Sequence, residues 1–124
     1  MSPRRSPLAE QELEIMKVVW DLENATVRDV YETLRKRRKV AYTTVMTMMN
    51  ILADKKLLKR SPQGRAYVYK AARPKKEIVT AMVRDFVGRL FDGSARPLLV
   101  QLVEDEQLTE QDLKQIRDII RKGS

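Results

Sequence analysis

The chain has 124 residues, of which 43% are hydrophobic and 34% charged, as expected for one small globular protein. It contains no cysteine and no histidine, which excludes disulfides and thiolate metal sites and removes the commonest metal ligand and general base. No apolar run approaches the ~18 residues of a membrane span, and no signal peptide precedes the first helix. We therefore expect a cytoplasmic protein with no cofactor and no small-molecule substrate.

The net charge of +8 is unevenly distributed along the chain. Residues 1–76 carry 18 Lys/Arg against 8 Asp/Glu, whereas residues 77–124 carry 7 against 9. This separation predicts a polyanion-binding module followed by a part with a different role. The alternative is a charged surface that only keeps the protein soluble.

The N-terminal half begins with an expected flexible basic arm over residues 1–8, in which Arg4 and Arg5 could reach a minor groove. Apolar residues at helical spacing predict a first helix over residues 9–22. Thr26, followed three residues later by Asp29, predicts the capped start of a second helix. That helix ends in five consecutive cations at residues 35–39, more than a helix dipole needs.

A third helix is predicted over residues 42–56, with an apolar stripe formed by Val45, Met48, Met49 and Leu52. The opposite face carries short or unbranched side chains, namely Thr43, Met46, Thr47 and Asn50. Such a face is either solvated or a recognition surface that approaches base edges closely.

Two short segments then predict a β-hairpin. Residues 57–61 and 65–70 flank Pro62-Gln-Gly64, and the second segment alternates aromatic and β-branched residues with others. Three helices followed by a hairpin define a winged helix-turn-helix domain over residues 9–73. The expected fold class is mainly α with a small β-hairpin.

Residues 74–124 predict three more helices, at about 74–91, at 95–104 and after a capping pair, Thr109 and Asp112. Their apolar stripe is too wide for so short a unit to bury, which predicts a homodimerisation domain. The alternative is that these helices fold back on the N-terminal domain. The expected dimer interface comprises Met82, Phe86, Leu90, Phe91, Leu98, Leu99, Leu102, Ile116 and Ile120.

These features resemble the penicillinase-repressor family of BlaI/MecI/CopY-type regulators over about residues 8–122. The matching segments are ELEIMKVVW at 12–20, TVRDV at 26–30, AYTTVMT at 41–47, YVY at 67–69, LLVQLV at 98–103 and the apolar pattern of 113–120. The resemblance implies a dimeric bacterial repressor that binds a dyad-symmetric double-stranded DNA operator through its third helix. By position, Thr43, Thr44 and Thr47 match the residues with which the family reads DNA.

The expected DNA contacts fall into two groups. Base readout is assigned to Tyr42, Thr43, Thr44, Met46, Thr47 and Asn50. Phosphate contacts are assigned to Arg28, Arg35, Lys36, Arg37, Arg38, Lys39, Lys59, Arg60 and Arg65.

The resemblance also implies how repression is relieved. Family members are released from DNA when a membrane-bound sensor protease, or a protease that it triggers, cuts the C-terminal part. The matching bond lies at Gln101–Leu102. Copper-sensing relatives use a C-terminal cysteine cluster, which this chain lacks.

Three other functions are alternatives to a sequence-specific repressor. An enzyme is disfavoured because no acid/base pair, activated nucleophile or phosphate loop is visible. A winged-helix scaffold for protein–protein contacts would not need its basic residues on one face. A nonspecific architectural DNA-binding protein would bind with little dependence on sequence.

Overall fold

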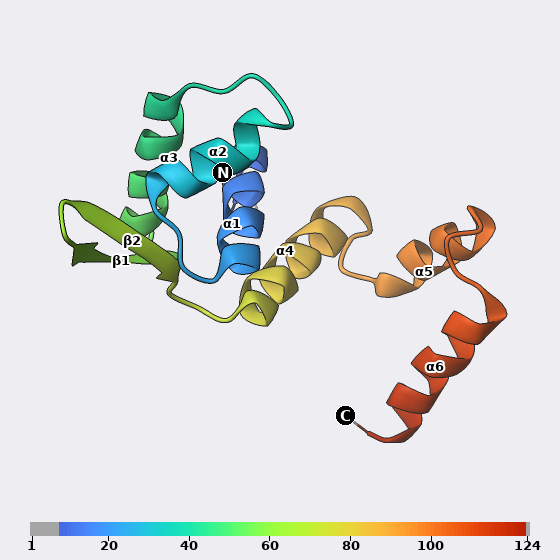
Figure 1. Ribbon diagram of the computed structural model, residues 1–124. Helices are drawn as coiled ribbons and strands as arrows, with labels where there is room; N and C mark the ends of the chain where they lie inside the picture. The colour runs from blue at the N-terminus through green and yellow to red at the C-terminus, as the bar shows by residue number, and fades with distance from the viewer. Residues whose placement is uncertain (1–7, 124) are drawn as a thin grey trace. The chain divides into compact units, whose positions relative to one another are not determined.

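Six helices and one β-hairpin make up residues 8–123, which are the part of the chain described by this computed structural model (Figure 1). In chain order they are α1 (Glu10–Leu22), α2 (Val27–Arg35), α3 (Tyr42–Asp54), β1 (Leu58–Gln63), β2 (Ala66–Ala71), α4 (Lys75–Leu90), α5 (Ala95–Glu104) and α6 (Glu110–Arg121). This confirms the predicted fold class. Arg4 and Arg5 of the expected basic arm lie outside the described residues.

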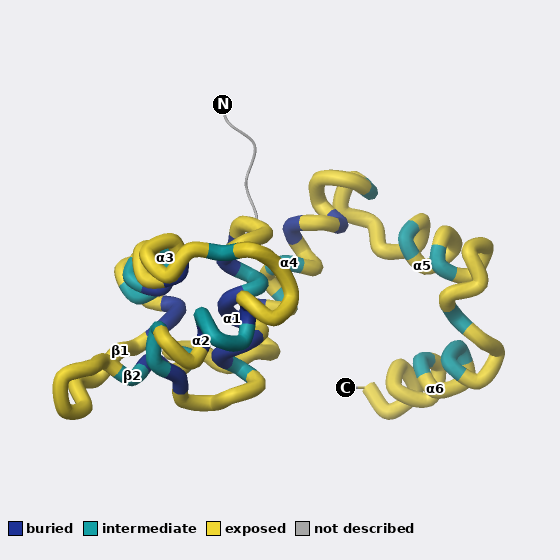
Figure 2. The backbone as a smooth tube through the Cα atoms, turned by 45° about the horizontal axis from the view of Figure 1, so that its top comes forward, coloured by how far each residue is buried: buried dark blue, intermediate teal, exposed yellow. Residues whose placement is uncertain are grey.

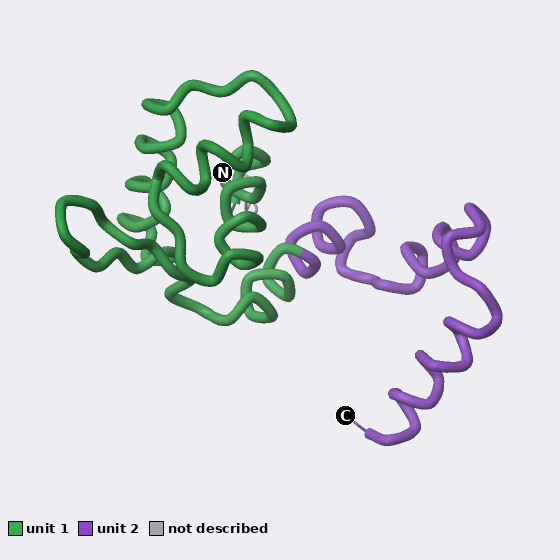
Figure 3. Tube along the Cα trace, viewed as in Figure 1, with its two compact units in different colours: residues 1–82 green, residues 83–124 purple. Residues whose placement is uncertain are grey.

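The chain divides into two compact units, one reaching to Met82 and one beginning at Val83 (Figure 3). Leu8 is buried in the core of the first unit, although it was assigned to the arm. The first turns of α4 also belong to this unit, because Ile78 and Met82 pack against the same core. The first unit therefore includes residues on both sides of the segment expected for the winged helix-turn-helix.

Side-chain caps fix the starts of α2 and α6. At α2, Thr26 Oγ1 accepts a hydrogen bond from the Asp29 N–H at 3.1 Å, and the Asp29 carboxylate accepts one from the Thr26 N–H at 3.0 Å. Thr109 and Asp112 form the same reciprocal pair at α6, at 3.1 and 2.9 Å. The Thr109 backbone N–H also holds the pKa of Asp112 below its usual range. Both predicted capping pairs are confirmed.

The hairpin differs from the prediction in the position of its turn. Antiparallel pairing runs from Leu58↔Ala71 to Gln63↔Ala66, so Pro62 lies inside β1 opposite Tyr67, and Gly64-Arg65 forms the turn. Gly64 has φ +63°, which a two-residue hairpin turn requires at its first position and glycine adopts without strain. Pro62 is tolerated because β1 is an edge strand. Ala25 pairs with Tyr69 on the other side of β2, a bridge that hydropathy did not predict.

The core of the first unit is built from one apolar side of each helix and from the hairpin (Figure 2). Its fully buried large side chains are Met16, Val18, Val19, Val30, Leu34, Val45, Met49 and Leu52. The α3 stripe was predicted correctly, with Met48 only half-buried. Burial of this stripe turns the opposite side of α3 towards solvent.

A buried carboxylate links the beginning of α1 to the end of α3. Glu12 is 4% exposed, and its oxygens accept hydrogen bonds from Lys55 Nζ at 2.9 Å each. Glu12 Oε1 also accepts from the Ala9 N–H at 2.9 Å, so one side chain caps α1 and anchors α3. This compensates for the cap that Ala9 cannot supply.

We expect Leu52→Ala to lower the free energy of unfolding by about 2–5 kcal/mol, because it opens a cavity at a fully buried position. Ile51→Ala is the matched control on the next residue of α3. Ile51 is 39% exposed, so its loss should cost less than about 1 kcal/mol. Urea unfolding followed by circular dichroism measures both values. Equal destabilisation by the two variants would contradict the assignment of the buried stripe.

The second unit buries far fewer residues than the first. In residues 83–123, α5 and α6 contain no buried residue, and burial on the α4 segment is confined to Asp85 and Val87 (Figure 2). None of the helices in residues 8–123 is long and apolar enough to cross a membrane.

Candidate nucleic-acid interface

The exposed side of α3 presents a row of threonines. Thr43, Thr44 and Thr47 are all exposed, and their hydroxyls have no hydrogen-bond partner among residues 8–123. A hydroxyl can donate to or accept from a base edge, and its neighbouring methyl can contact a thymine methyl. The side chains are short, so a duplex groove could approach the helix backbone closely. The structure thus brings these three predicted residues together on one face.

Beside this row lies a groove of ≈ 540 Å³ between α3, the start of α2 and the hairpin. Its lining mixes aromatic rings with arginines and consists of Thr26, Val27, Arg28, Tyr42, Met46, Asn50, Arg60, Arg65, Ala66, Tyr67 and Tyr69. Tyr42 also packs edge-to-face on Tyr31 of α2, with ring centroids 5.5 Å apart. Tyr42, Met46 and Asn50 therefore lie between the threonine row and the hairpin, as three predicted readout residues that border one groove.

Asn50 has a role in this groove that the sequence did not predict. Its Oδ1 accepts hydrogen bonds from Arg60 Nη1 at 2.6 Å and from Tyr69 Oη at 3.0 Å. The Arg60 guanidinium also lies 5.2 Å from the centroid of the Tyr67 ring, within cation–π range. Tyr67 and Tyr69 were not among the predicted site residues. They alternate along β2, with Tyr69 opposite Arg60 and Tyr67 opposite Pro62, and this alternation is the sequence signal that could have identified them.

The basic residues assigned to phosphates do not form one cluster. Arg28, Arg60 and Arg65 line the groove. Arg28 and Arg35 both pair with Glu32, at 3.7 and 2.9 Å, and the hydrogen bond that Arg35 donates to Glu32 raises the pKa of Arg35. A phosphate that approaches either arginine would compete with this carboxylate.

Arg37 and Arg38 instead line a hollow beside α1. Arg38 forms a close pair with Glu14, with Nη2 2.6 Å from Oε1, and the hydrogen bond from Arg38 holds the pKa of Glu14 below its usual range. The same bond raises the pKa of Arg38. Lys36 and Lys39 are exposed and form no ion pair within the described part of the chain.

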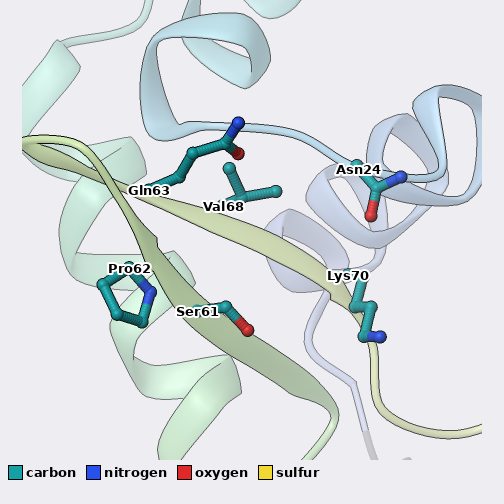
Figure 4. Close-up of a pocket in the computed structure, with 6 residues that line it drawn as sticks. All are labelled: Asn24, Ser61, Pro62, Gln63, Val68 and Lys70. Atoms are coloured by element: carbon teal, nitrogen blue, oxygen red, sulfur yellow. The ribbon is translucent and has the colours of Figure 1, made fainter.

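Lys59 lies on the other face of the hairpin from Arg60, because side chains alternate along a strand. That face carries a hollow of ≈ 200 Å³ lined by Asn24, Ser61, Pro62, Gln63, Val68 and Lys70 (Figure 4). Its polar side chains are spread along the strands rather than directed at one point (Figure 4). We assign it no function.

The residues expected at a dimer interface lie in two environments. Met82 packs against the core of the first unit. In the second unit, Phe86, Leu90 and Ile120 are 45%, 62% and 70% exposed. Leu99 is also exposed, while Phe91, Leu98, Leu102 and Ile116 are half-buried. Phe86 and Phe91 contact each other edge-to-face at 5.9 Å. The second unit by itself therefore leaves an apolar surface uncovered.

The bond between Gln101 and Leu102 lies inside α5, three residues before the helix ends. Gln101 is exposed and Leu102 half-buried. A protease cleaves an extended segment, so cutting here requires the end of α5 to unwind. The helix has ten residues and no side-chain cap at Ser94, which favours such local opening.

Comparison with known proteins shows what the chain resembles. The family model described as penicillinase repressor matches residues 8–122. A transcriptional regulator, BlaI, of Mycobacterium tuberculosis is 37% identical over 99 residues, which cover 78% of this chain and 72% of that protein.

Two solved structures match the first part of the chain. The solution structure of the DNA-binding domain of the repressor BlaI has a TM-score of 0.53 and 26% identity, covering 61% of this chain and 93% of that one. The monomeric form of Bacillus licheniformis BlaI, in complex with the blaP half-operator, has a TM-score of 0.50 and 28% identity, covering 56% and 85%. Because the family model matches residues 8–122, which are nearly the whole chain, the chain belongs to the penicillinase repressor family.

Proposed function

We propose that this protein is a DNA-binding transcriptional repressor that acts as a homodimer on a dyad-symmetric operator. One observation carries the proposal. The chain exposes on α3 a row of hydroxyls with no hydrogen-bond partner in residues 8–123, beside an arginine-lined groove, in a domain matched by a relative that is bound to a half-operator. We infer that it works in the cytoplasm by occupying DNA, without catalysis.

In this account α3 enters the major groove and reads bases through its exposed face. Thr43, Thr44 and Thr47 make the base contacts, with Tyr42 and Met46 at the edge of the groove. Each good contact contributes ~1–3 kcal/mol of discrimination against the wrong base. Phosphate contacts from Arg65, Lys36 and Lys39 add affinity that does not depend on sequence.

Dimerisation follows from the small number of base contacts. One copy of α3 reads only a few base pairs, whereas two copies double the readout and fix the half-site spacing near one helical turn or a multiple of it. The uncovered apolar side chains of the second unit, Phe86, Leu90 and Ile120, supply the surface that a second copy would bury.

Relief of repression by proteolysis fits this design. Cutting Gln101–Leu102 would remove α6 and the end of α5, and with them part of the dimer surface, while leaving the threonine row intact. The half-sites would then be bound by separate chains. Incubation with a sensor protease, followed by mass spectrometry of the fragments, tests this step.

Selection of bound fragments from genomic DNA tests the proposed function directly. A repressor enriches fragments that share an inverted repeat near promoters. An architectural DNA-binding protein enriches fragments with no common repeat, and a protein–protein scaffold enriches none. Either of the last two results would contradict the proposal.

Salt dependence distinguishes free arginines from paired ones. We expect Arg65→Ala to lower the slope of log affinity against log salt by about 0.9 per chain, because Arg65 lines the groove without an ion pair in residues 8–123. Arg38→Ala should change the slope less, since Glu14 already neutralises this guanidinium. Fluorescence anisotropy with a labelled operator measures both slopes. A larger change for Arg38→Ala would contradict the assignment.

A further inference from the structure

We propose that Asn50 is a positioning residue that holds the Arg60 guanidinium for a DNA phosphate, and that it does not read a base. This inference rests on the proposed DNA-binding function and revises the expected role of one residue in it. Asn50 lies on α3 and Arg60 on β1, so the contact also ties the hairpin to the recognition helix.

The hairpin directs two donors to the same oxygen. Arg60 and Tyr69 are directly opposite each other in the strand register, so their side chains leave the same face of the hairpin. Both reach Asn50 Oδ1, at 2.6 Å from Arg60 and 3.0 Å from Tyr69. Tyr69 is itself buried and faces Arg60 in the strand register, and its backbone N–H and C=O form hydrogen bonds with Ala25 at 2.8 and 2.9 Å. Its hydroxyl is therefore a fixed point for the Asn50 amide.

The chemistry of the amide argues against base reading. Asparagine recognises adenine by accepting from N6 with its oxygen while donating to N7 with its nitrogen. An amide oxygen has two lone pairs, and Asn50 Oδ1 already accepts from two donors. Contact with adenine would break the bond to Arg60. The orientation of the amide is secure because a guanidinium can only donate, so the atom that faces it must be oxygen.

Arg60 differs from the ion-paired arginines because its side-chain partners are uncharged. Its partners are the neutral Asn50 oxygen and the Tyr67 ring. In residues 8–123, every other arginine with a side-chain hydrogen bond has a carboxylate partner, as Arg38 has in Glu14. No carboxylate in residues 8–123 therefore neutralises the charge of Arg60. Its position is fixed, and its remaining N–H donors stay available. Such a preorganised guanidinium suits the planar, bidentate recognition of a phosphate.

A double-mutant cycle on operator affinity tests the coupling. We expect Arg60→Ala to weaken binding about tenfold and Asn50→Ala about threefold to tenfold. The double variant should be within about twofold of Arg60→Ala, because Asn50 acts only through Arg60. Asn24→Ala is the matched control, since Asn24 lies beside the other face of the hairpin (Figure 4). It should bind as the wild type does.

The salt slope gives a second readout that a base-reading asparagine would not change. A neutral side chain releases no counterion of its own, so any reduction of the slope in Asn50→Ala reports the loss of a charged contact. We expect the salt slope of Asn50→Ala to fall towards that of Arg60→Ala, which should itself be lower than the wild-type slope by about 0.9 per chain. Additive losses in the cycle together with an unchanged slope would overturn the inference.

A measurement on the free wild-type protein keeps the test independent of both folding and DNA. Nitrogen NMR should find slowed guanidinium rotation and resolved Nη resonances for Arg60, and averaged resonances for Arg65. If the Nη resonances of Arg60 are averaged as those of Arg65 are, the inference fails even where DNA binding is intact. If the wild type binds no duplex while Arg60 is held, the proposed function fails and the contact stands.

Discussion

Replacement of Leu90 by aspartate should convert the protein to a monomer and weaken operator binding by about 10²–10⁴-fold. Leu90 is 62% exposed in the second unit, so the substitution leaves the monomer core untouched. In the dimer it would bury an unpaired carboxylate, whose desolvation costs several kcal/mol. The large effect on DNA arises because the second half-site is no longer bound by a tethered copy.

Gln111→Asp is the control for this experiment, because it introduces the same carboxylate at an exposed polar position of α6. It should remain dimeric with unchanged affinity. Sedimentation velocity gives the oligomeric state, and anisotropy gives the affinity. A Leu90→Asp protein that is monomeric and still binds the operator with wild-type affinity would refute the dependence of operator binding on dimerisation.

The Thr43→Ala and Thr47→Ala substitutions together should reduce the preference for operator over random DNA by about 1–3 kcal/mol per lost contact. Both side chains are exposed on α3 and contribute nothing to the core, so stability should be nearly unchanged. Nonspecific affinity should also persist, because it depends on phosphate contacts from other residues.

The matched control is Thr33→Ala on α2, whose hydroxyl donates to the Asp29 carbonyl at 2.9 Å and lies outside the groove lining. It should keep the full operator preference. Competition between labelled operator and unlabelled random DNA measures each ratio. Equal losses on operator and random DNA for the double variant would place the recognition surface elsewhere.

Much of this architecture was predictable because it is encoded locally. The capping pairs at Thr26 and Thr109 fix helix starts within four residues of sequence. The 3.6-residue period of Val45, Met49 and Leu52 sets which side of α3 is buried, and therefore which side carries the threonines.

The contacts that the sequence did not predict are those whose partners are distant in sequence. Arg38 forms its ion pair with Glu14, which lies 24 residues earlier and is therefore not recognisable as a partner from the sequence. Nothing near Asn50 in the sequence indicates that Arg60 and Tyr69 donate hydrogen bonds to its side chain. The hairpin turn was misplaced because Pro62 is a strong turn former, whereas strand pairing assigns the turn to Gly64-Arg65.

The most direct test is the stoichiometry of the complex on DNA. Sedimentation equilibrium of the protein with a duplex carrying the selected inverted repeat should show two chains per duplex, bound cooperatively. A duplex with one half-site should bind far more weakly. A single 14.5 kDa particle in solution, with equal affinity for the repeat and for its scrambled sequence, would contradict the account.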